Sequence, residues 1–391
     1  MEVMEEIKQI QKYTSYSIIR PIGKGAFGQV YEAEHIRLKT KVAIKQTKRK
    51  HINKFNKEVF SLRNLTHPNI VSFIYVFMTK FSLYLVMELV PGCDLYVYLK
   101  RNNMKLEENT CRIIGRQLSS AIYYMHSQTI AHRDIKPDNI MIDETTMQIK
   151  LVDFGLSGTV FNGRLLTSSC GTEGYMAPEI CKNQPYDLRA DMWSTGVTFY
   201  VMITGILPDF IYMKNGKINE YIDEIIELHF LVDGVKNTTA HFQNMLASLL
   251  QSEPSKRMDS LQLSTHPWIT KDYQEPLKTH GYKPLSPSNR FKIYEKIALL
   301  TNNTVRQTVN ILRKKSLGSF SAMYRLLRQP EFEKQYNKNC DKKPVPERVL
   351  DDSSEFQRKQ GRKRALEDYS ESPKKLLRRQ SVDTARLDID I

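Results

Sequence analysis

The chain has 391 residues with a formal net charge of +15, 41% hydrophobic residues and 26% charged residues. This length predicts more than one domain, and the hydrophobic fraction is enough for a buried core. The sequence has no apolar run of about 18 residues, and its first residues lack the apolar stretch of a signal peptide, so we expect neither a membrane span nor secretion. Five cysteines without CxxC spacing favour free thiols in a reducing compartment.

Up to residue 87 the sequence alternates short β-rich runs with turns and contains one helical pattern. The strands are predicted at residues 16–19, 29–33, 41–45, 71–77 and 82–87, and the helix at residues 53–65. From Pro91 onward apolar residues recur at helical spacing, interrupted by short β runs at 140–142 and 148–152. This order predicts a small β-rich lobe with one helix, joined near residues 88–94 to a larger helical lobe.

Beyond Trp268 the composition changes. Proline and turn-forming residues predict a linker, after which three short helical patterns appear at residues 291–300, 305–312 and 320–327. Towards the C-terminus polar and charged residues replace aromatic ones, which predicts a mostly disordered tail. We therefore divide the chain into an N-terminal extension (1–15), a main domain (16–269), a linker (270–289), a small helical segment (290–328) and the tail (329–391).

A glycine-rich turn lies between the first two predicted strands. Its sequence, Gly23-Lys24-Gly25-Ala26-Phe27-Gly28-Gln29-Val30, fills every position of GxGxxGxV. Glycines let the backbone approach a phosphate closely, so that its N–H groups can face the anion. Dinucleotide-binding folds share GxGxxG but need a parallel βαβ unit, whereas here a further β run, Val42-Ala43-Ile44-Lys45, follows. The pattern therefore predicts a loop that covers the phosphates of a nucleotide.

Two short motifs carry the reactive groups. His132-Arg133-Asp134-Ile135-Lys136-Pro137-Asp138-Asn139 is followed by Asp153-Phe154-Gly155. Asp134 can accept a proton from a hydroxyl group, and Lys136 can neutralise a transferring phosphoryl group. The side-chain oxygens of Asn139 and Asp153 suit Mg²⁺. Because the two motifs occur in this order and spacing, they are highly specific for phosphoryl transfer.

On these motifs, residues 16–269 resemble a eukaryotic Ser/Thr protein kinase of the calmodulin-dependent kinase group, especially its AMP-activated-kinase-related branch. The resemblance implies an α+β, bilobal protein kinase fold that uses ATP and Mg²⁺ and phosphorylates Ser or Thr of protein substrates. Lys136 and the segment Gly171-Thr172-Glu173-Gly174-Tyr175 favour Ser/Thr over Tyr as the acceptor. The alternative is a pseudokinase scaffold that binds nucleotide or partners without turnover.

The resemblance also implies a role for each matching residue. Asp134 would be the catalytic base, with Lys136 and Thr172 beside it, while Asn139 and Asp153 would hold Mg²⁺. The implied ATP-binding residues are Gly23, Lys24, Gly25, Ala26, Phe27, Gly28, Val30, Ala43, Lys45, Glu58, Met87, Glu88 and Val90.

Within this set, Lys45 would hold the α- and β-phosphates and pair with Glu58, although the 13-residue separation is shorter than the family usually has. Met87 would be the gatekeeper at the back of the adenine pocket. Backbone groups of Glu88 and Val90 would bind the adenine edge.

The segment between Asp153 and Glu179 would be the activation segment. Ser168 is the first candidate for an activating phosphate and Thr167 the second, with Arg133 as the cation that pairs with it, so an upstream activating kinase is implied. Asp94 and Asp138 fall where kinases that select basic substrates place acids, which implies a preference for Arg before the target residue. Three further matches are structural: Glu179 would pair with Arg257, Asp191 would anchor the catalytic-loop backbone, and His266-Pro267-Trp268 would close the domain. One departure is Asp209, which interrupts the Leu-Pro-Phe that relatives usually have, so the helix at 214–227 would sit differently and alter substrate docking.

Residues 290–328 resemble the three-helix, ubiquitin-associated-like segment found after the kinase domain in that branch, which implies docking on the catalytic domain. Ubiquitin binding, a basic amphipathic calmodulin target at residues 305–315 and a plain helical extension are the alternatives. Basic runs at 357–364 and 374–379 indicate a nuclear localisation signal in addition to a cytoplasmic location, and Ser381 follows two arginines as a candidate autophosphorylation site. We do not expect nucleic acid as a partner, because no nucleic-acid-binding motif accompanies the excess of basic residues.

Overall fold

The structure is a computed structural model that describes residues 10, 14–25, 28–161, 163–208, 233–277, 279, 281–314 and 318–340, with the backbone alone for 233 and 335–340. Several sequence predictions lie outside the described residues. They are the ATP-binding positions Ala26 and Phe27, the helix at 214–227, the basic runs of the tail and Ser381.

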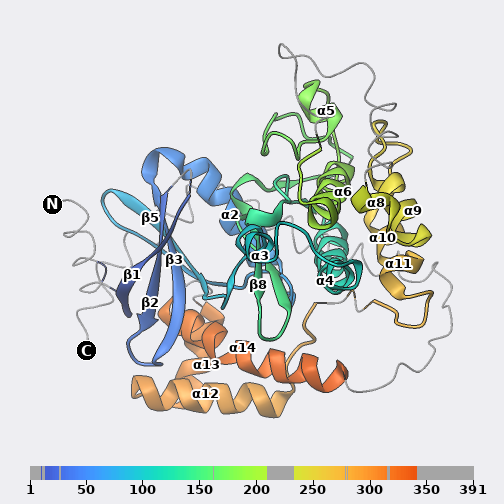
Figure 1. The fold of residues 1–391 in the computed structure, drawn as a ribbon. Helices are drawn as coiled ribbons and strands as arrows, with labels where there is room; N and C mark the ends of the chain where they lie inside the picture. The colour runs from blue at the N-terminus through green and yellow to red at the C-terminus, as the bar shows by residue number, and fades with distance from the viewer. Residues whose placement is uncertain are drawn as a thin grey trace.

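The first lobe is built on a five-stranded antiparallel sheet (Figure 1). In spatial order its strands are β1 (Tyr16–Gly25), β2 (Gly28–His35), β3 (Thr40–Lys48), β5 (Ser82–Glu88) and β4 (Phe73–Met78). Gly25 of β1 lies opposite Gly28 of β2, so the glycine-rich turn closes this hairpin. A Cβ atom on Gly28 would lie 1.6 Å from the carbonyl oxygen of Gln46, so no larger residue fits at this position.

One helix, α2 (Ile52–Asn64), follows β3 after the short turn η1 (Arg49–His51). Its buried face carries Phe55, Glu58, Ser61 and Leu62, which share one side of the helix because they are three or four residues apart. This face packs against the sheet and against η3 (Phe154–Leu156), which belongs to the second lobe. The helix therefore touches both halves of the catalytic region.

The second lobe is mainly helical, with the long helices α4 (Glu108–Ser127) and α6 (Arg189–Thr204) at its centre. The apolar residues that predicted α4, such as Ile114, Leu118 and Met125, are completely buried. The other helices are α3 (Leu95–Arg101), α5 (Pro178–Cys181), α8 (Asp233–Lys236), α9 (Ala240–Leu249), α10 (Ser260–Thr265) and α11 (Pro267–Thr270). The short elements are β6 (Cys93–Asp94), β7 (Ile130–Ala131), η2 (Pro137–Asn139), β8 (Ile140–Asp143), β9 (Gln148–Leu151) and β10 (Gly158–Thr159). The predicted α+β, bilobal fold is confirmed.

Three helices follow: α12 (Pro287–Thr301), α13 (Val305–Lys314) and α14 (Ser319–Cys340). They begin where the sequence predicts the helical segment, but α14 continues well past the expected boundary at residue 328 and through Pro330. α14 lies against β4, and it extends from there beneath β8 (Figure 1). Ala322 and Leu326 on α14 pack into the same apolar cluster as residues of the sheet.

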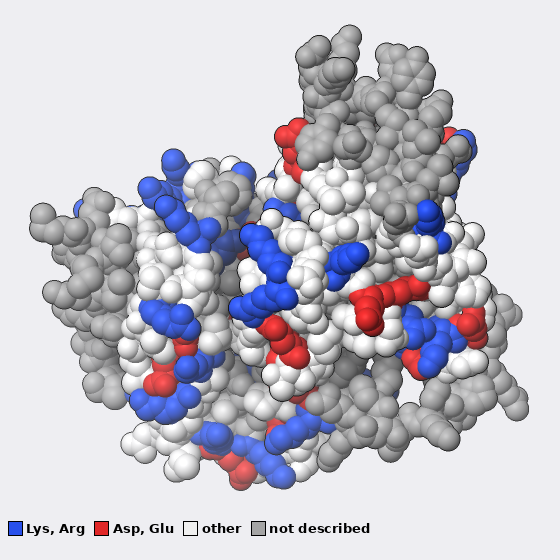
Figure 2. All heavy atoms as spheres, in the orientation of Figure 1, with Lys and Arg blue, Asp and Glu red and all other residues white. Residues whose placement is uncertain are grey.

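On the face drawn in Figure 2, Lys and Arg side chains of the described surface are interspersed with Asp and Glu and do not form one continuous basic patch. Within the described residues, none of the helices combines the length and apolar character that crossing a membrane requires.

Candidate active site

A buried lysine connects the sheet, α2 and the start of η3. The Nζ atom of Lys45 on β3 lies 2.7 Å from a carboxylate oxygen of Glu58 and 2.6 Å from one of Asp153. Burial alone would lower the pKa of Lys45, but the charges of Glu58 and Asp153 outweigh it and hold this pKa above its ordinary value. The lysine is therefore a fixed cation that connects α2 with the Asp-Phe-Gly turn.

A second group of polar side chains surrounds Asp134. The hydroxyl group of Thr172 donates to Asp134 Oδ1 at 2.6 Å, and Lys136 donates to the Thr172 oxygen at 2.5 Å. Lys136 Nζ also lies 3.3 Å from Asp134 Oδ2. The amide nitrogen of Asn139 donates to both the backbone carbonyl and the carboxylate of Asp134, at 2.8 Å in each case. These contacts fix the orientation of the carboxylate.

The loop that carries Asp134 is anchored from below by Asp191 at the start of α6. Its carboxylate accepts hydrogen bonds from the backbone N–H groups of His132 and Arg133, at 2.8 and 2.7 Å. Asp191 is completely buried, and burial would raise its pKa, but a hydrogen bond from His126 and the backbone donors outweigh this and hold its pKa below the usual range. Arg133 has a left-handed backbone with φ of 69°, so the anchor also stabilises a strained turn.

The comparison with known sequences decides the family. The sequence profile of the protein kinase domain matches residues 16–269. The chain belongs to the protein kinase family.

Curated relatives agree with this assignment. The chain is similar to Sperm motility kinase 3A of Mus musculus, with 32% identity over 337 residues that cover 84% of this chain and 63% of that protein. It is also similar to a probable myosin light chain kinase of Dictyostelium discoideum, with 33% identity over 310 residues covering 76% of this chain and 75% of that protein. An SNF1-related protein kinase catalytic subunit of Arabidopsis thaliana is 33% identical over 269 residues, 67% of this chain and 53% of that protein. The expected resemblance to the AMP-activated-kinase-related group is confirmed. The chain spans less than two thirds of the length of the mouse relative.

In this family the residues around Asp153 are where a magnesium ion would bind, and the side chains present fit it. The amide nitrogen of Asn139 is used by Asp134, which leaves the amide oxygen to face a cation. Asp153 has a left-handed backbone with φ of 58°, and its carboxylate is 43% exposed, so one oxygen can reach a ligand while the other binds Lys45. When bound, Mg²⁺ would neutralise negative charge on the ATP phosphates.

The residues predicted to contact adenine lie on β2, β3 and β5 and just after β5. Ala43 lies opposite Met87 in the antiparallel register, and Val30 lies opposite Lys45, so these apolar residues line one strand-to-strand surface. The backbone N–H of Glu88 donates to the backbone carbonyl of Ser72 at 3.1 Å and is therefore already used within the protein. Val90 is half-buried just beyond it, in the connection between the lobes.

The remaining loop residues, Gly23, Lys24, Gly25 and Gly28, lie at the turn end of the β1–β2 hairpin.

The activation segment contacts the catalytic loop through Arg133. Its guanidinium group donates to the hydroxyl of Ser168 at 2.7 Å and to the backbone carbonyl of Ser157 at 3.1 Å. The hydroxyl of Tyr186 accepts from the same guanidinium and donates to the carbonyl of Ser168 at 2.7 Å. Ser168 and its neighbour Thr167 are both exposed. The sequence pattern found the arginine and the serine, but it gave no signal for Tyr186, which approaches from outside the segment.

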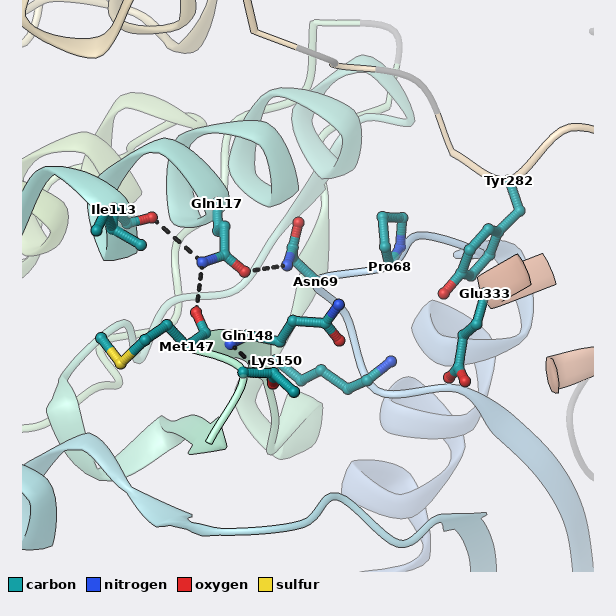
Figure 3. Close-up of a pocket in the computed structure, with 10 residues that line it drawn as sticks. Pro68, Asn69, Ile113, Gln117, Met147, Gln148, Lys150, Tyr282 and Glu333 are labelled. Carbon is teal, nitrogen blue, oxygen red and sulfur yellow. Dashed lines mark hydrogen bonds between the residues drawn. The ribbon is translucent and has the colours of Figure 1, made fainter. Parts of the chain in front are cut away.

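A cavity of about 190 Å³ lies behind the connection between the lobes, away from these catalytic groups (Figure 3). Its walls come from α4, β9 and α14, and Figure 3 shows Glu333 and Tyr282 on one side of it and Asn69 and Gln117 on the other. The cavity therefore marks the seam between the catalytic lobes and the C-terminal helices.

Proposed function

We propose that this chain is an ATP-dependent Ser/Thr protein kinase. The observation that carries the proposal is the intact arrangement of Lys45 between Glu58 and Asp153, together with the hydrogen-bonded set around Asp134. A scaffold that binds partners without turnover would require neither set. Transfer of labelled phosphate from Mg-ATP to a Ser peptide that contains Arg tests the proposal. No transfer, even after treatment with an activating kinase, would favour the scaffold.

The geometry supports a direct transfer. The substrate oxygen forms a bond to the γ-phosphorus as the bond to the bridging oxygen breaks, so ADP leaves, and the hydroxyl proton passes to the carboxylate of Asp134. Lys136 lies close enough to Asp134 to neutralise charge on the transferring group. Thr172 holds the same carboxylate in place.

We further propose that substrates carry Arg a few residues before the target. Asp138 supports this, because it is exposed and its carboxylate is accessible to a substrate. Asp94 lies at the start of α3 and accepts the Val97 N–H, so an Asn there removes the charge and keeps the cap.

We expect Asp94→Asn and Asp138→Asn each to lower kcat/KM for an Arg-containing peptide about fivefold, since a partly exposed ion pair contributes about 1 kcal/mol. Both variants should treat the same peptide with Ala in place of Arg like the wild type. A peptide array that shows an acidic or proline-directed preference would contradict this specificity.

An activating phosphate on Ser168 is the proposed control of the activation segment. Support comes from the 2.7 Å contact between Ser168 and Arg133, because a phosphate there would form charge-assisted hydrogen bonds with the guanidinium. We expect Ser168→Ala to reduce activation by an upstream kinase about 10- to 100-fold, since one such bond contributes about 1.5–3 kcal/mol. Thr167→Ala is the matched neighbour and should be activated normally. If Thr167→Ala is the inactive variant, the phosphate belongs on Thr167.

The C-terminal helices are proposed to regulate the kinase by docking behind the connection between the lobes. The carboxylate of Glu88 points away from the adenine side, where it accepts from Ser72 N–H at 2.6 Å and pairs with Lys150 at 3.0 Å. Gln329 of α14 donates to the same carboxylate at 3.3 Å and accepts from the Ser72 hydroxyl at 3.1 Å. Arg325 donates to the Ile74 carbonyl at 2.9 Å. Because Lys45 and Glu58 are paired while α14 is docked, we infer that docking supports the active arrangement.

Loss of the Gln329 contact should therefore weaken ATP binding. We expect Gln329→Ala to raise the KM for ATP about two- to tenfold with a smaller change in kcat, since a net hydrogen bond contributes about 0.5–1.5 kcal/mol. Lys334→Ala is the control, because Lys334 is exposed on the same helix and pairs only with the nearby Glu331 among the contacts described. Equal KM values for ATP in the two variants would show that Gln329 takes no part in the regulation. Calcium-dependent retention on calmodulin would instead support the calmodulin alternative.

A further inference from the structure

Two buried serines connect α2 to the start of the activation segment. Ser61 on α2 and Ser157 directly after η3 lie with their hydroxyl oxygens 2.7 Å apart. Both residues are at most 2% exposed. A hydrogen bond between two buried groups is stronger than one at the surface, because water does not compete for either group.

The direction of this hydrogen bond follows from the neighbouring contacts. The Ser157 hydroxyl also donates to the backbone carbonyl of Phe154 at 2.7 Å, and a carbonyl can only accept. Since a hydroxyl has one hydrogen, Ser157 must accept from Ser61. The described contacts therefore form a short chain from α2 through Ser157 to Phe154.

The position of Ser61 on its helix gives this chain a consequence for the active site. Ser61 is three residues after Glu58 and lies on the same buried face of α2. Glu58 binds Lys45, and Lys45 binds Asp153, the residue that begins the Asp-Phe-Gly turn. The same turn is thus tied to α2 at two points, one ionic and one neutral.

Ser157 is also bonded on its other side. Its backbone carbonyl accepts from Arg133, the residue whose guanidinium reaches Ser168 in the activation segment. A displacement of Ser157 would therefore disturb its contacts with both the catalytic loop and α2.

We propose that Ser61 is a positioning residue for phosphoryl transfer: through Ser157 its hydroxyl holds α2 against the Asp-Phe-Gly turn and so keeps Glu58 on Lys45. This inference rests on the proposed kinase activity but not on phosphorylation of Ser168. Removing the hydroxyl should let α2 move away from the turn a larger fraction of the time, and the Lys45–Glu58 pair should open with it.

The test compares the full chain with Ser61→Ala, Ser157→Ala and the double variant. The matched control is Ser264→Ala, because Ser264 on α10 is buried to the same degree and its hydroxyl makes a 2.8 Å hydrogen bond within its own helix. We expect Ser61→Ala to lower kcat about 3- to 10-fold, the effect of one hydrogen bond, while the KM for the peptide stays unchanged. The double variant should be no slower than Ser157→Ala, because Ser61 acts only through Ser157.

A second measurement keeps this inference separate from the kinase proposal. Hydrogen exchange of the amides in Ile52–Asn64 should speed up in Ser61→Ala relative to Ser264→Ala, whether or not the wild type turns over substrate. A merely structural serine would lower the melting temperature and leave kcat and α2 exchange like those of the control. Unchanged α2 exchange, or kcat losses that multiply in the double variant, would overturn the proposal. If the wild type were inactive but α2 exchange were still faster in Ser61→Ala, the proposed kinase activity would be wrong. The role of the Ser61–Ser157 contact in holding α2 would stand.

Discussion

Replacing Asp134 with Asn is expected to lower kcat for peptide phosphorylation by about 10²- to 10⁴-fold, the usual contribution of a general base. Asn has nearly the same size and can still contact Thr172 and Lys136, but it cannot accept the proton of the substrate hydroxyl. Because Asp134 does not contact the lysine that would hold the ATP phosphates, ATP affinity should change little. Steady-state kinetics with an Arg-containing Ser peptide, together with a direct titration of ATP, measure the two effects separately.

The matched control for this change is Asp259→Asn. Asp259 caps α10 in the second lobe by accepting from the Gln262 N–H, and Asn is an equally good cap, so neither stability nor kcat should change. If Asp134→Asn turned over peptide at the wild-type rate, the proton would have another acceptor and the assigned base would be wrong. If the wild type itself were inactive while ATP bound, the scaffold would be the better description.

The sequence allowed the catalytic residues to be predicted because their chemistry is local. Asp134, Lys136 and Asn139 lie within one short loop, so their order alone places them together. Lys45 and Glu58 were predicted to pair despite a short separation, and the structure places them 2.7 Å apart. The fold shortens the entry to α2 with one 3₁₀ turn, and the face of the helix that carries Glu58 still points at β3.

Contacts between residues that are far apart in the sequence could not be predicted in the same way. Gln329 and Glu88 are 241 positions apart, and neither has a pattern that marks it as anything but a surface polar residue. Ser61 likewise reads as an ordinary helix serine until the fold brings Ser157 beside it. The identity of such partners is decided by tertiary packing, which a local pattern does not contain.

The end of the C-terminal helical segment shows a third reason why part of the structure could not be predicted from the sequence. The third helical pattern was predicted at residues 320–327 and the segment to end at residue 328. A proline ordinarily interrupts a helix because it lacks the N–H donor and its ring clashes with the preceding turn. In the structure α14 continues through Pro330, and the next turn places Phe332 in a stack with Tyr282 at 4.7 Å. Packing of this aromatic residue and of Met323 in one apolar cluster offsets the lost hydrogen bond.

Arg257→Ala is expected to lower the free energy of unfolding by about 3–5 kcal/mol, because it leaves the buried carboxylate of Glu179 without its partner. The guanidinium binds both carboxylate oxygens of Glu179, at 2.6 and 2.9 Å, and also donates to the carbonyl of Gln251 at 2.9 Å. Arg257 is 1% exposed and Glu179 is 3% exposed, so water cannot replace the lost partner. For a region of this size the melting temperature should fall by about 6–20 °C, at roughly 2–4 °C per kcal/mol.

The neighbouring Lys256→Ala is the control, since Lys256 and Glu253 form an exposed pair, and such pairs contribute about 0–1 kcal/mol. The double variant Glu179→Leu with Arg257→Met separates two explanations of the loss. If the cost of Arg257→Ala is mainly the stranded charge, removing both charges should restore part of the melting temperature, because the double change then costs less than the sum of the single changes. A double variant as unstable as that sum would mean that the arginine acts through its backbone acceptors and its packing on Trp193, where the guanidinium lies 5.3 Å from the ring, and that the carboxylate is incidental.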